Sequence, residues 1–147
     1  MNIKTLFLKN FRNYKELNLN LSPFLNIFTG DNAQGKTNIV ESLYYAALGT
    51  SYRIKNDNDL INWQENEALI NINFSRLDIK NNIKFHLSKL KRRQIILNGA
   101  NIRQKDLPGN ITVVMFSPED LMLVKGMPAL RRRFLDIELS QTDIFYY

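Results

Sequence analysis

The segment from Gly30 to Thr37 has the spacing G-x-x-x-x-G-K-T, which is typical of loops that bind the phosphates of a nucleoside triphosphate. Gly30 and Gly35 allow the backbone to turn so that its N–H groups face one concavity. The ammonium group of Lys36 is expected at the β- and γ-phosphates, and the hydroxyl of Thr37 at a Mg²⁺ ion. The alternative interpretation is a glycine turn before a core helix, without a ligand.

The elements on either side of this loop agree with the first interpretation. The apolar run Phe24–Thr29 predicts a short strand before the loop. A helix is expected from Gly35 to about Leu48, and Gly49 is a natural stop. The positive end of such a helix favours an anion. Apolar residues recur at helical spacing at Ile39, Val40, Leu43, Tyr44 and Ala47.

The rest of the chain reads mainly as strands, followed by helices. Period-two alternation and apolar runs predict strands over Ile3–Phe11, Glu16–Leu21, Ala68–Phe74, Ile83–Ser88, Gln94–Leu97 and Ile111–Phe116, the last fully buried. Residues 51–66 are expected to be irregular, and Asn98-Gly99 predicts a tight turn. Helix starts follow at Ser117 and at Gly126, and the second helix is expected to continue to the last residue, as in a truncated chain.

Three sequence blocks resemble the RecF family of bacterial DNA-repair ATPases, which is related to SMC and Rad50. The segment Asn32–Leu43 is similar to that family's phosphate-binding loop, and Leu8–Tyr14 to its N-terminal segment. A third block, Phe116–Leu121 with Val124–Gly126 and Arg131–Asp136, is close to diagnostic of RecF. The resemblance covers only the N-terminal part of RecF.

This resemblance implies an α/β fold of the P-loop NTPase class. The whole chain, residues 1–147, would form the first lobe of an ABC-type ATPase head, with an antiparallel strand group beside a sheet that carries the loop. It implies ATP and Mg²⁺ as ligands, with Thr37 at the metal, and it matches Arg12 to an arginine that reaches the nucleotide phosphates in relatives. An exposed residue at a strand end is the alternative for Arg12. The expected nucleotide-binding residues are Arg12, Gly30, Asp31, Asn32, Ala33, Gln34, Gly35, Lys36, Thr37 and Asn38.

The same resemblance implies a biological role. RecF proteins dimerise on ATP, bind gapped DNA or single-/double-strand junctions, and act with RecO and RecR in recombinational repair and replication restart. The family's signature motif and Walker B acid do not occur in this sequence, and Val113–Phe116 is rejected as a Walker B strand because Ser117-Pro118 follows it. We therefore expect this chain alone to bind ATP weakly and to hydrolyse little or none.

Charge and composition narrow the remaining possibilities. The net charge of +6 favours a polyanionic partner, although it also fits simple solubility. Lys89, Lys91, Arg92 and Arg93 are expected on an exposed hairpin tip, either as DNA phosphate contacts or as a guard against edge aggregation. The absence of cysteine excludes disulfides and Cys-ligated zinc. Without an apolar run long enough for a membrane span, a cytoplasmic location is the default expectation.

Two other functions stay open at this point. One is a different P-loop enzyme, such as a small-molecule kinase, although no pattern for a substrate pocket or a catalytic acid is evident. The other is a basic, non-catalytic DNA-binding module whose loop binds no nucleotide. That module would bind DNA with a steep salt dependence and without regard to ATP.

Overall fold

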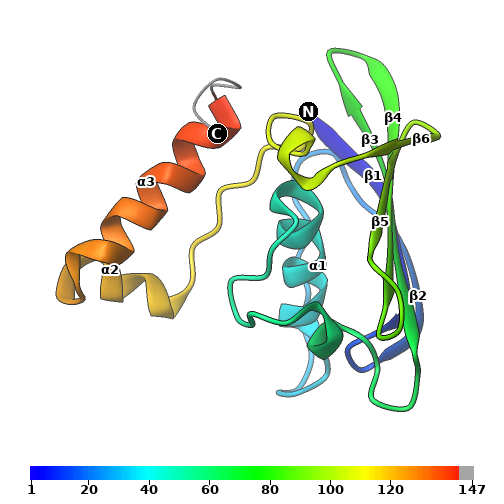
Figure 1. Cartoon of the computed structure of the whole chain (residues 1–147), viewed down its shortest axis with the longest axis horizontal. Helices are drawn as coiled ribbons and strands as arrows, with labels where there is room; N and C mark the ends of the chain where they lie inside the picture. The colour runs from blue at the N-terminus through cyan, green and yellow to red at the C-terminus, as the bar shows by residue number, and fades with distance from the viewer. Residues whose placement is uncertain (143–147) are drawn as a thin grey trace.

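A six-stranded antiparallel sheet forms the main body of the protein in a computed structural model, which describes residues 1–142 (Figure 1). The strand order is β2-β1-β3-β4-β5-β6. The strands are β1 (Asn2–Phe11), β2 (Tyr14–Asn20), β3 (Glu67–Arg76), β4 (Ile79–Ser88), β5 (Gln94–Leu97) and β6 (Ala100–Ile102). The helices are α1 (Lys36–Leu48), α2 (Met122–Lys125) and α3 (Pro128–Thr142), with short 3₁₀ turns at Asp57–Leu60, Gln104–Asp106 and Pro118–Leu121.

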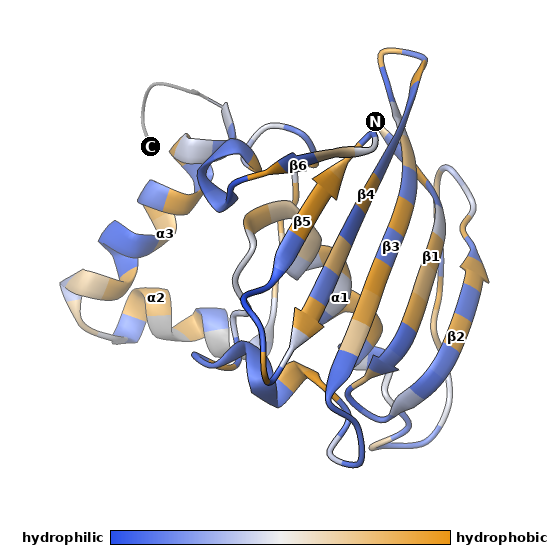
Figure 2. Cartoon of the chain, turned by 45° about the vertical axis from the view of Figure 1, so that its right-hand side comes forward, coloured by the Kyte–Doolittle hydropathy of each residue, from blue (hydrophilic) through white to orange (hydrophobic). Residues whose placement is uncertain are grey.

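The hydrophobic core lies between one face of this sheet and α1. Side chains on alternate positions of β1, β3 and β4 point to that face, as the period of a strand requires. Figure 2 shows the resulting alternation of apolar and polar residues along the strands. Tyr45 of α1 stacks edge-on against Phe85 of β4, with ring centroids 5.3 Å apart. This packing fixes α1, and with it the loop that precedes α1.

The other face of the sheet is polar and is joined by asparagine side chains. The amide of Asn82 donates to the side-chain oxygens of Asn71 and Asn73, each at 2.7 Å. Asn73 in turn donates to the hydroxyl of Thr5 at 2.7 Å. These bonds connect three neighbouring strands on the face that α1 does not cover. Asn71, Asn73 and Asn82 therefore have a structural role.

Most of the predicted elements are confirmed. The helix expected from Gly35 to Leu48 is α1, and the N–H of Gly49, at φ 68°, closes it by donating to the carbonyl of Tyr45 at 2.7 Å. The turn at Asn98-Gly99 joins β5 to β6, and both residues have positive φ, as a type I′ hairpin requires. The helix start at Gly126 is confirmed by α3, while its predicted last residues, 143–147, lie outside the described part of the chain.

Two predicted strands are wrong. Phe24–Thr29 and Ile111–Phe116 are extended segments that belong to no sheet of the described chain. A strand needs a neighbour to accept and donate its ladder bonds, and no described strand lies beside either segment. Ile111 is buried, but Phe24 and Phe116 are almost fully exposed, at 96% and 84%. The separate sheet expected to carry the phosphate loop is therefore not formed by residues 1–142.

The C-terminal part of the described chain forms an arm that lies apart from the sheet. Residues 111–117 run in an extended path from the main body to α2 and α3 (Figure 1). Two hydrogen bonds between Gln141 and the backbone of Val113, of 2.7 and 3.0 Å, hold the end of α3 against this extended path. Among residues 1–142, no helix has the length and apolar character needed to cross a membrane.

Candidate nucleotide-binding site

The predicted phosphate loop forms a turn directly before α1. Gly30, Ala33 and Gly35 have φ angles of 140°, 66° and 103°, which lie in the region that side chains disfavour. Gly35 is the N-cap of α1, and its carbonyl accepts from the N–H groups of Asn38 and Ile39 at 2.8 and 3.2 Å. The loop therefore stands at the positive end of a helix of 13 residues, where an anion is stabilised.

The turn between β1 and β2 supports the loop from one side. A Cβ on Gly35 would lie 2.7 Å from Oδ1 of Asn13 and 2.8 Å from the hydroxyl of Tyr14. The amide of Asn13 donates to the carbonyl of Gln34 at 3.1 Å, and the amide of Asn38 donates to Oδ1 of Asn13 at 2.8 Å. A side chain at position 35 would therefore displace Asn13 or Tyr14, in addition to the strain of φ 103°.

The side chain of Lys36 lies across the phosphate loop. Its Nζ donates to the carbonyls of Gly30 and Asp31 at 2.7 and 2.6 Å. These bonds hold the ammonium group over the loop, where a terminal phosphate would meet it. Thr37, the next residue, is exposed in the first turn of α1. A lysine, a hydroxyl and a row of backbone N–H groups at one helix end are the donor set that a triphosphate and Mg²⁺ require.

Arg12 lies close to this site but is held by a carboxylate. Its Nε and one Nη donate to the two oxygens of Glu41 at 3.0 and 2.7 Å, a bidentate pair. Its other Nη donates to the carbonyl of Asp59 at 2.9 Å. Glu41 is completely buried in α1, and the hydroxyl of Ser51 donates to it at 2.6 Å. In this arrangement Arg12 ties the β1–β2 turn to α1, and its expected contact with phosphates remains a prediction.

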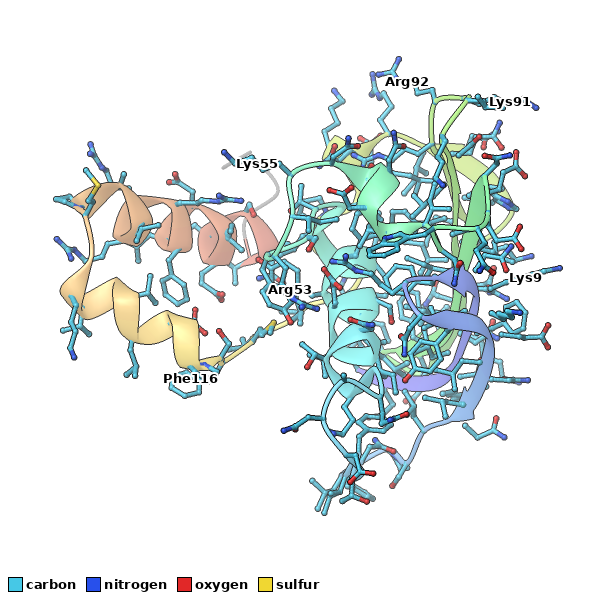
Figure 3. The ribbon with its side chains drawn as sticks, turned by 90° about the horizontal axis from the view of Figure 1, so that it is seen from below. Lys9, Arg53, Lys55, Lys91, Arg92 and Phe116 are labelled. Carbon is cyan, nitrogen blue, oxygen red and sulfur yellow. The ribbon has the colours of Figure 1, made fainter. Side chains whose placement is uncertain are left out.

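Arg53 is a second cation near the loop, and sequence reasoning missed it. One Nη of Arg53 donates to Oδ1 of Asn38 at 3.1 Å and lies 3.6 Å from Glu41. Arg53 lines a hollow of about 570 Å³ together with Lys36 and Thr37. Figure 3 shows it beside α1, on the side toward Phe116. The one sequence signal for Arg53 is its position four residues after Gly49, which ends α1, the helix that follows the phosphate loop.

The structure separates the four basic residues of the predicted hairpin tip. Lys91 and Arg92 are exposed and extend away from the main body, and Lys89 is half-buried (Figure 3). Arg93 points the other way: it donates to the hydroxyl of Tyr45, the carbonyl of Gly49 and a carboxylate oxygen of Asp57, each at 2.7 Å. The expectation of a common exposed tip is therefore wrong for Arg93.

The surroundings of Arg93 also change the acidity of its partners. Burial raises the pKa of the Tyr45 hydroxyl, and the negative charge of Asp57 raises it further. Burial lowers the pKa of the Arg93 guanidinium, but Tyr45 and Asp57 outweigh burial and raise it overall. Arg93 thus stays charged and ties β5 to α1 and to the 3₁₀ turn at Asp57–Leu60. This is a structural role.

Thr37 is the residue that the sequence predicts at a Mg²⁺ ion. Within residues 1–142, no group of three or more His, Asp or Glu side chains is placed to hold a metal ion. The exposed hydroxyl of Thr37 fits the expected single protein ligand to a Mg²⁺ that is also held by phosphate oxygens. The sites predicted from the sequence and brought together by the fold are therefore the loop, Lys36, Thr37 and Asn38.

The comparisons with known proteins agree with this geometry. A family model described as an AAA domain matches residues 5–133. Proteins named DNA replication and repair protein RecF from Clostridium tetani and Clostridium botulinum are each 47% identical over the whole of this chain. A solved structure of the recombination mediator RecF with ATP, 30% identical, superposes with a TM-score of 0.91 over 97% of this chain. An SMC head domain from Thermotoga maritima, 21% identical, gives 0.60 over 72%.

These matches define first the class and then the family. The fold is that of P-loop ATPase heads of the ABC type, as predicted, with an adjoining antiparallel sheet. The chain belongs to the AAA-domain family, and its predicted resemblance to RecF is confirmed. It spans about 40% of the length of the curated relatives that it matches. The SMC likeness, at 21% identity, supports the fold alone.

Proposed function

We propose that this chain is the ATP-binding part of a RecF-like protein of DNA replication and repair. The observation that carries the proposal is the built loop: Gly35 packed against Asn13 and Tyr14, and Lys36 held over the loop at the positive end of α1. The resemblance to a RecF structure with bound ATP supports the same ligand. In this proposal Lys36 and the loop N–H groups bind the phosphates and Thr37 binds Mg²⁺.

The wider role is proposed on the same basis. The protein would bind gapped DNA or single-/double-strand junctions, dimerise on ATP, and act with RecO and RecR in the cytoplasm. Lys91 and Arg92, with Lys89 beside them, offer exposed cations for DNA phosphates. Hydrolysis by this chain alone would be weak or absent, because the family's signature motif and Walker B acid do not occur in this sequence.

Calorimetric titration with Mg-ATP tests the nucleotide part of this proposal. Lys36→Ala removes the charge that faces the terminal phosphates, and a charged hydrogen bond contributes about 1.5–3 kcal/mol. We expect affinity to fall by roughly ten- to a hundred-fold, with unfolding by urea little changed. Lys80→Ala is the matched control. Lys80 is an exposed lysine at the start of β4, outside the phosphate loop.

Three outcomes separate the candidate functions. Loss of binding in Lys36→Ala but not in Lys80→Ala supports the proposal. Equal affinities in all three proteins, or no binding by the folded wild type, would contradict it and favour the basic DNA-binding module. Transfer of phosphate to a small-molecule acceptor would favour the kinase.

A further inference from the structure

Trp63 is the only tryptophan of the chain, and its side chain is 92% exposed. It lies on a turn that is fixed to β1. The N–H of Asn62 donates to the carbonyl of Asn10 at 2.8 Å, and the side-chain amide of Asn62 donates to the carbonyl of Arg12 at 2.9 Å. Isolated exposed apolar residues are common in proteins, so the meaning of Trp63 depends on what surrounds it.

Cations lie on the neighbouring segments. The N–H of Lys89 donates to the carbonyl of Asn66 at 2.9 Å, and Lys89 Nζ approaches the carbonyl of Trp63 at 3.5 Å. The hairpin tip with Lys91 and Arg92 therefore starts beside the Trp63 turn. An exposed aromatic ring next to clustered cations is the arrangement that proteins use to bind single-stranded nucleic acid, with bases on the ring and phosphates on the cations.

A hollow of about 610 Å³ begins at Gln64, directly after Trp63. Its volume is within the range of small-ligand sites, ~300–1,000 Å³. Its lining mixes several kinds of polar group: the cations Lys9, Lys91 and Arg92, the carboxylates Glu65 and Glu67, the amides Asn10, Gln64, Asn66 and Gln94, and the side chains of His86 and Ser88.

This mixture fits unpaired nucleotides better than a duplex. Carboxylates repel the two phosphate backbones of a duplex. A surface that binds duplex DNA through its backbone is therefore expected to be uniformly basic. Amides can instead donate to and accept from the exposed edges of unpaired bases, and carboxylates can accept from them. The cations remain available for the phosphates of one strand.

We propose that Trp63 and this hollow bind unpaired nucleotides of a DNA strand, with a base stacked on the Trp63 indole and phosphates on Lys91 and Arg92. The proposal rests on the DNA-binding part of the proposed function and specifies which form of DNA meets this surface. No base contact is required at Arg93, which the fold uses internally.

Trp63 fluorescence in the 147-residue chain provides the test, because no other tryptophan contributes. We expect an oligothymidylate to quench this fluorescence. Measured with a dye-labelled oligothymidylate, Trp63→Ala should weaken binding roughly tenfold, because stacking on an aromatic side chain supports each bound base. Trp63→Phe keeps an aromatic face and should lose much less. Affinity for a blunt duplex of equal length should not change in either variant.

Each outcome decides a different point. Combined Lys91→Ala and Arg92→Ala should weaken the binding of both oligonucleotides, which checks the DNA part of the proposed function. If Trp63→Ala binds oligothymidylate as wild type does, or if saturation leaves the fluorescence unchanged, the inference is overturned. Binding of the duplex but not of oligothymidylate overturns the inference alone. Binding of neither overturns the inference and the DNA-binding proposal together.

Discussion

The sheet with α1 and the arm formed by residues 111–142 differ sharply in how they are held. The sheet and α1 share a core in which residues such as Leu8, Ile70 and Phe85 are completely buried. On the arm, Val124 and Met127 are 82% and 74% exposed, and the buried residues of α3 are the polar Ser140 and Gln141. The first region therefore determines its own geometry, whereas the arm joins it through a few apolar residues: Ile111, buried in the core, and Val113 and Ile137, partly buried against it.

This difference explains where the nucleotide site gets its shape. Every contact that supports the phosphate loop comes from the first region: the β1–β2 turn, α1 and the loop itself. The arm supplies only one wall of the hollow beside Lys36, through Met115 and Phe116. We therefore expect changes in the first region to have larger effects than changes in the arm.

The largest effect is expected from Glu41→Ala. This substitution removes a completely buried carboxylate and leaves Arg12, itself mostly buried, without its partner. Breaking a buried ion pair in this way costs about 3–5 kcal/mol of unfolding free energy. Leu135→Ala in α3, where the side chain is 55% exposed, is the comparison and should change stability by less than about 0.5 kcal/mol. Urea denaturation measures both, and equal losses would refute the distinction between the regions.

A smaller effect is expected from Arg93→Met. The variant keeps apolar volume but loses the bonds to Tyr45, Asp57 and the carbonyl of Gly49. We expect a loss of about 2 kcal/mol, because hydrogen bonds to charged groups contribute about 1.5–3 kcal/mol. Arg92→Met, one residue away and exposed, is the matched control and should leave the urea midpoint almost unchanged. If the urea midpoint of Arg92→Met fell as far as that of Arg93→Met, the structural role assigned to Arg93 alone would be contradicted.

Within the arm, Gln141→Ala should have the clearest effect. It removes the two bonds to the backbone of Val113 and leaves that N–H without its acceptor. The expected cost is about 1 kcal/mol. Amide hydrogen exchange should become faster at residue 113 and in residues 128–142, while exchange in β3 and β4 stays unchanged. Faster exchange in the sheet would show that the arm supports the core after all.

The smallest effect concerns pH. The N–H and guanidinium of Arg103 lower the pKa of the exposed Asp106 carboxyl, with the backbone bond as the largest cause. A carboxyl whose pKa is lower in the folded state adds stability above its unfolded pKa of about 3.9 and loses it as pH falls through the folded value. The small difference in melting temperature between wild type and Asp106→Asn should thus be present at neutral pH and vanish in acid, as the pH falls below the folded pKa. A difference that grows in acid would contradict this sign.

The sequence predicted the local elements well and the long-range contacts poorly. The loop, α1 and the five longest strands follow from spacing and periodicity, because each signal lies within a few residues. The buried Glu41 was missed because its partners Arg12 and Arg53 stand 29 and 12 positions away in the chain, and nothing in the spacing pairs them.

The two wrong strands and Arg93 show the same limit. Phe24–Thr29 and Ile111–Phe116 have the composition of strands, but a strand also needs a neighbour, and composition does not supply one. Arg93 was grouped with Lys91 and Arg92 by position alone, but it directly precedes β5 and lies two positions before the buried Ile95, so its side chain points to the same face, toward α1. Tertiary partners decided these cases.

Hydrogen exchange of the whole chain, with and without Mg-ATP, tests the central claim most directly. The claim is that the sheet and α1 build the phosphate loop by themselves. It predicts slow exchange in β1, β3, β4 and α1 without nucleotide, fast exchange in α2 and α3, and new protection on adding Mg-ATP that is confined to residues 30–38 and the surroundings of Arg53. Equal protection of α3 and β3 without nucleotide, or a loop unaffected by Mg-ATP, would contradict the claim.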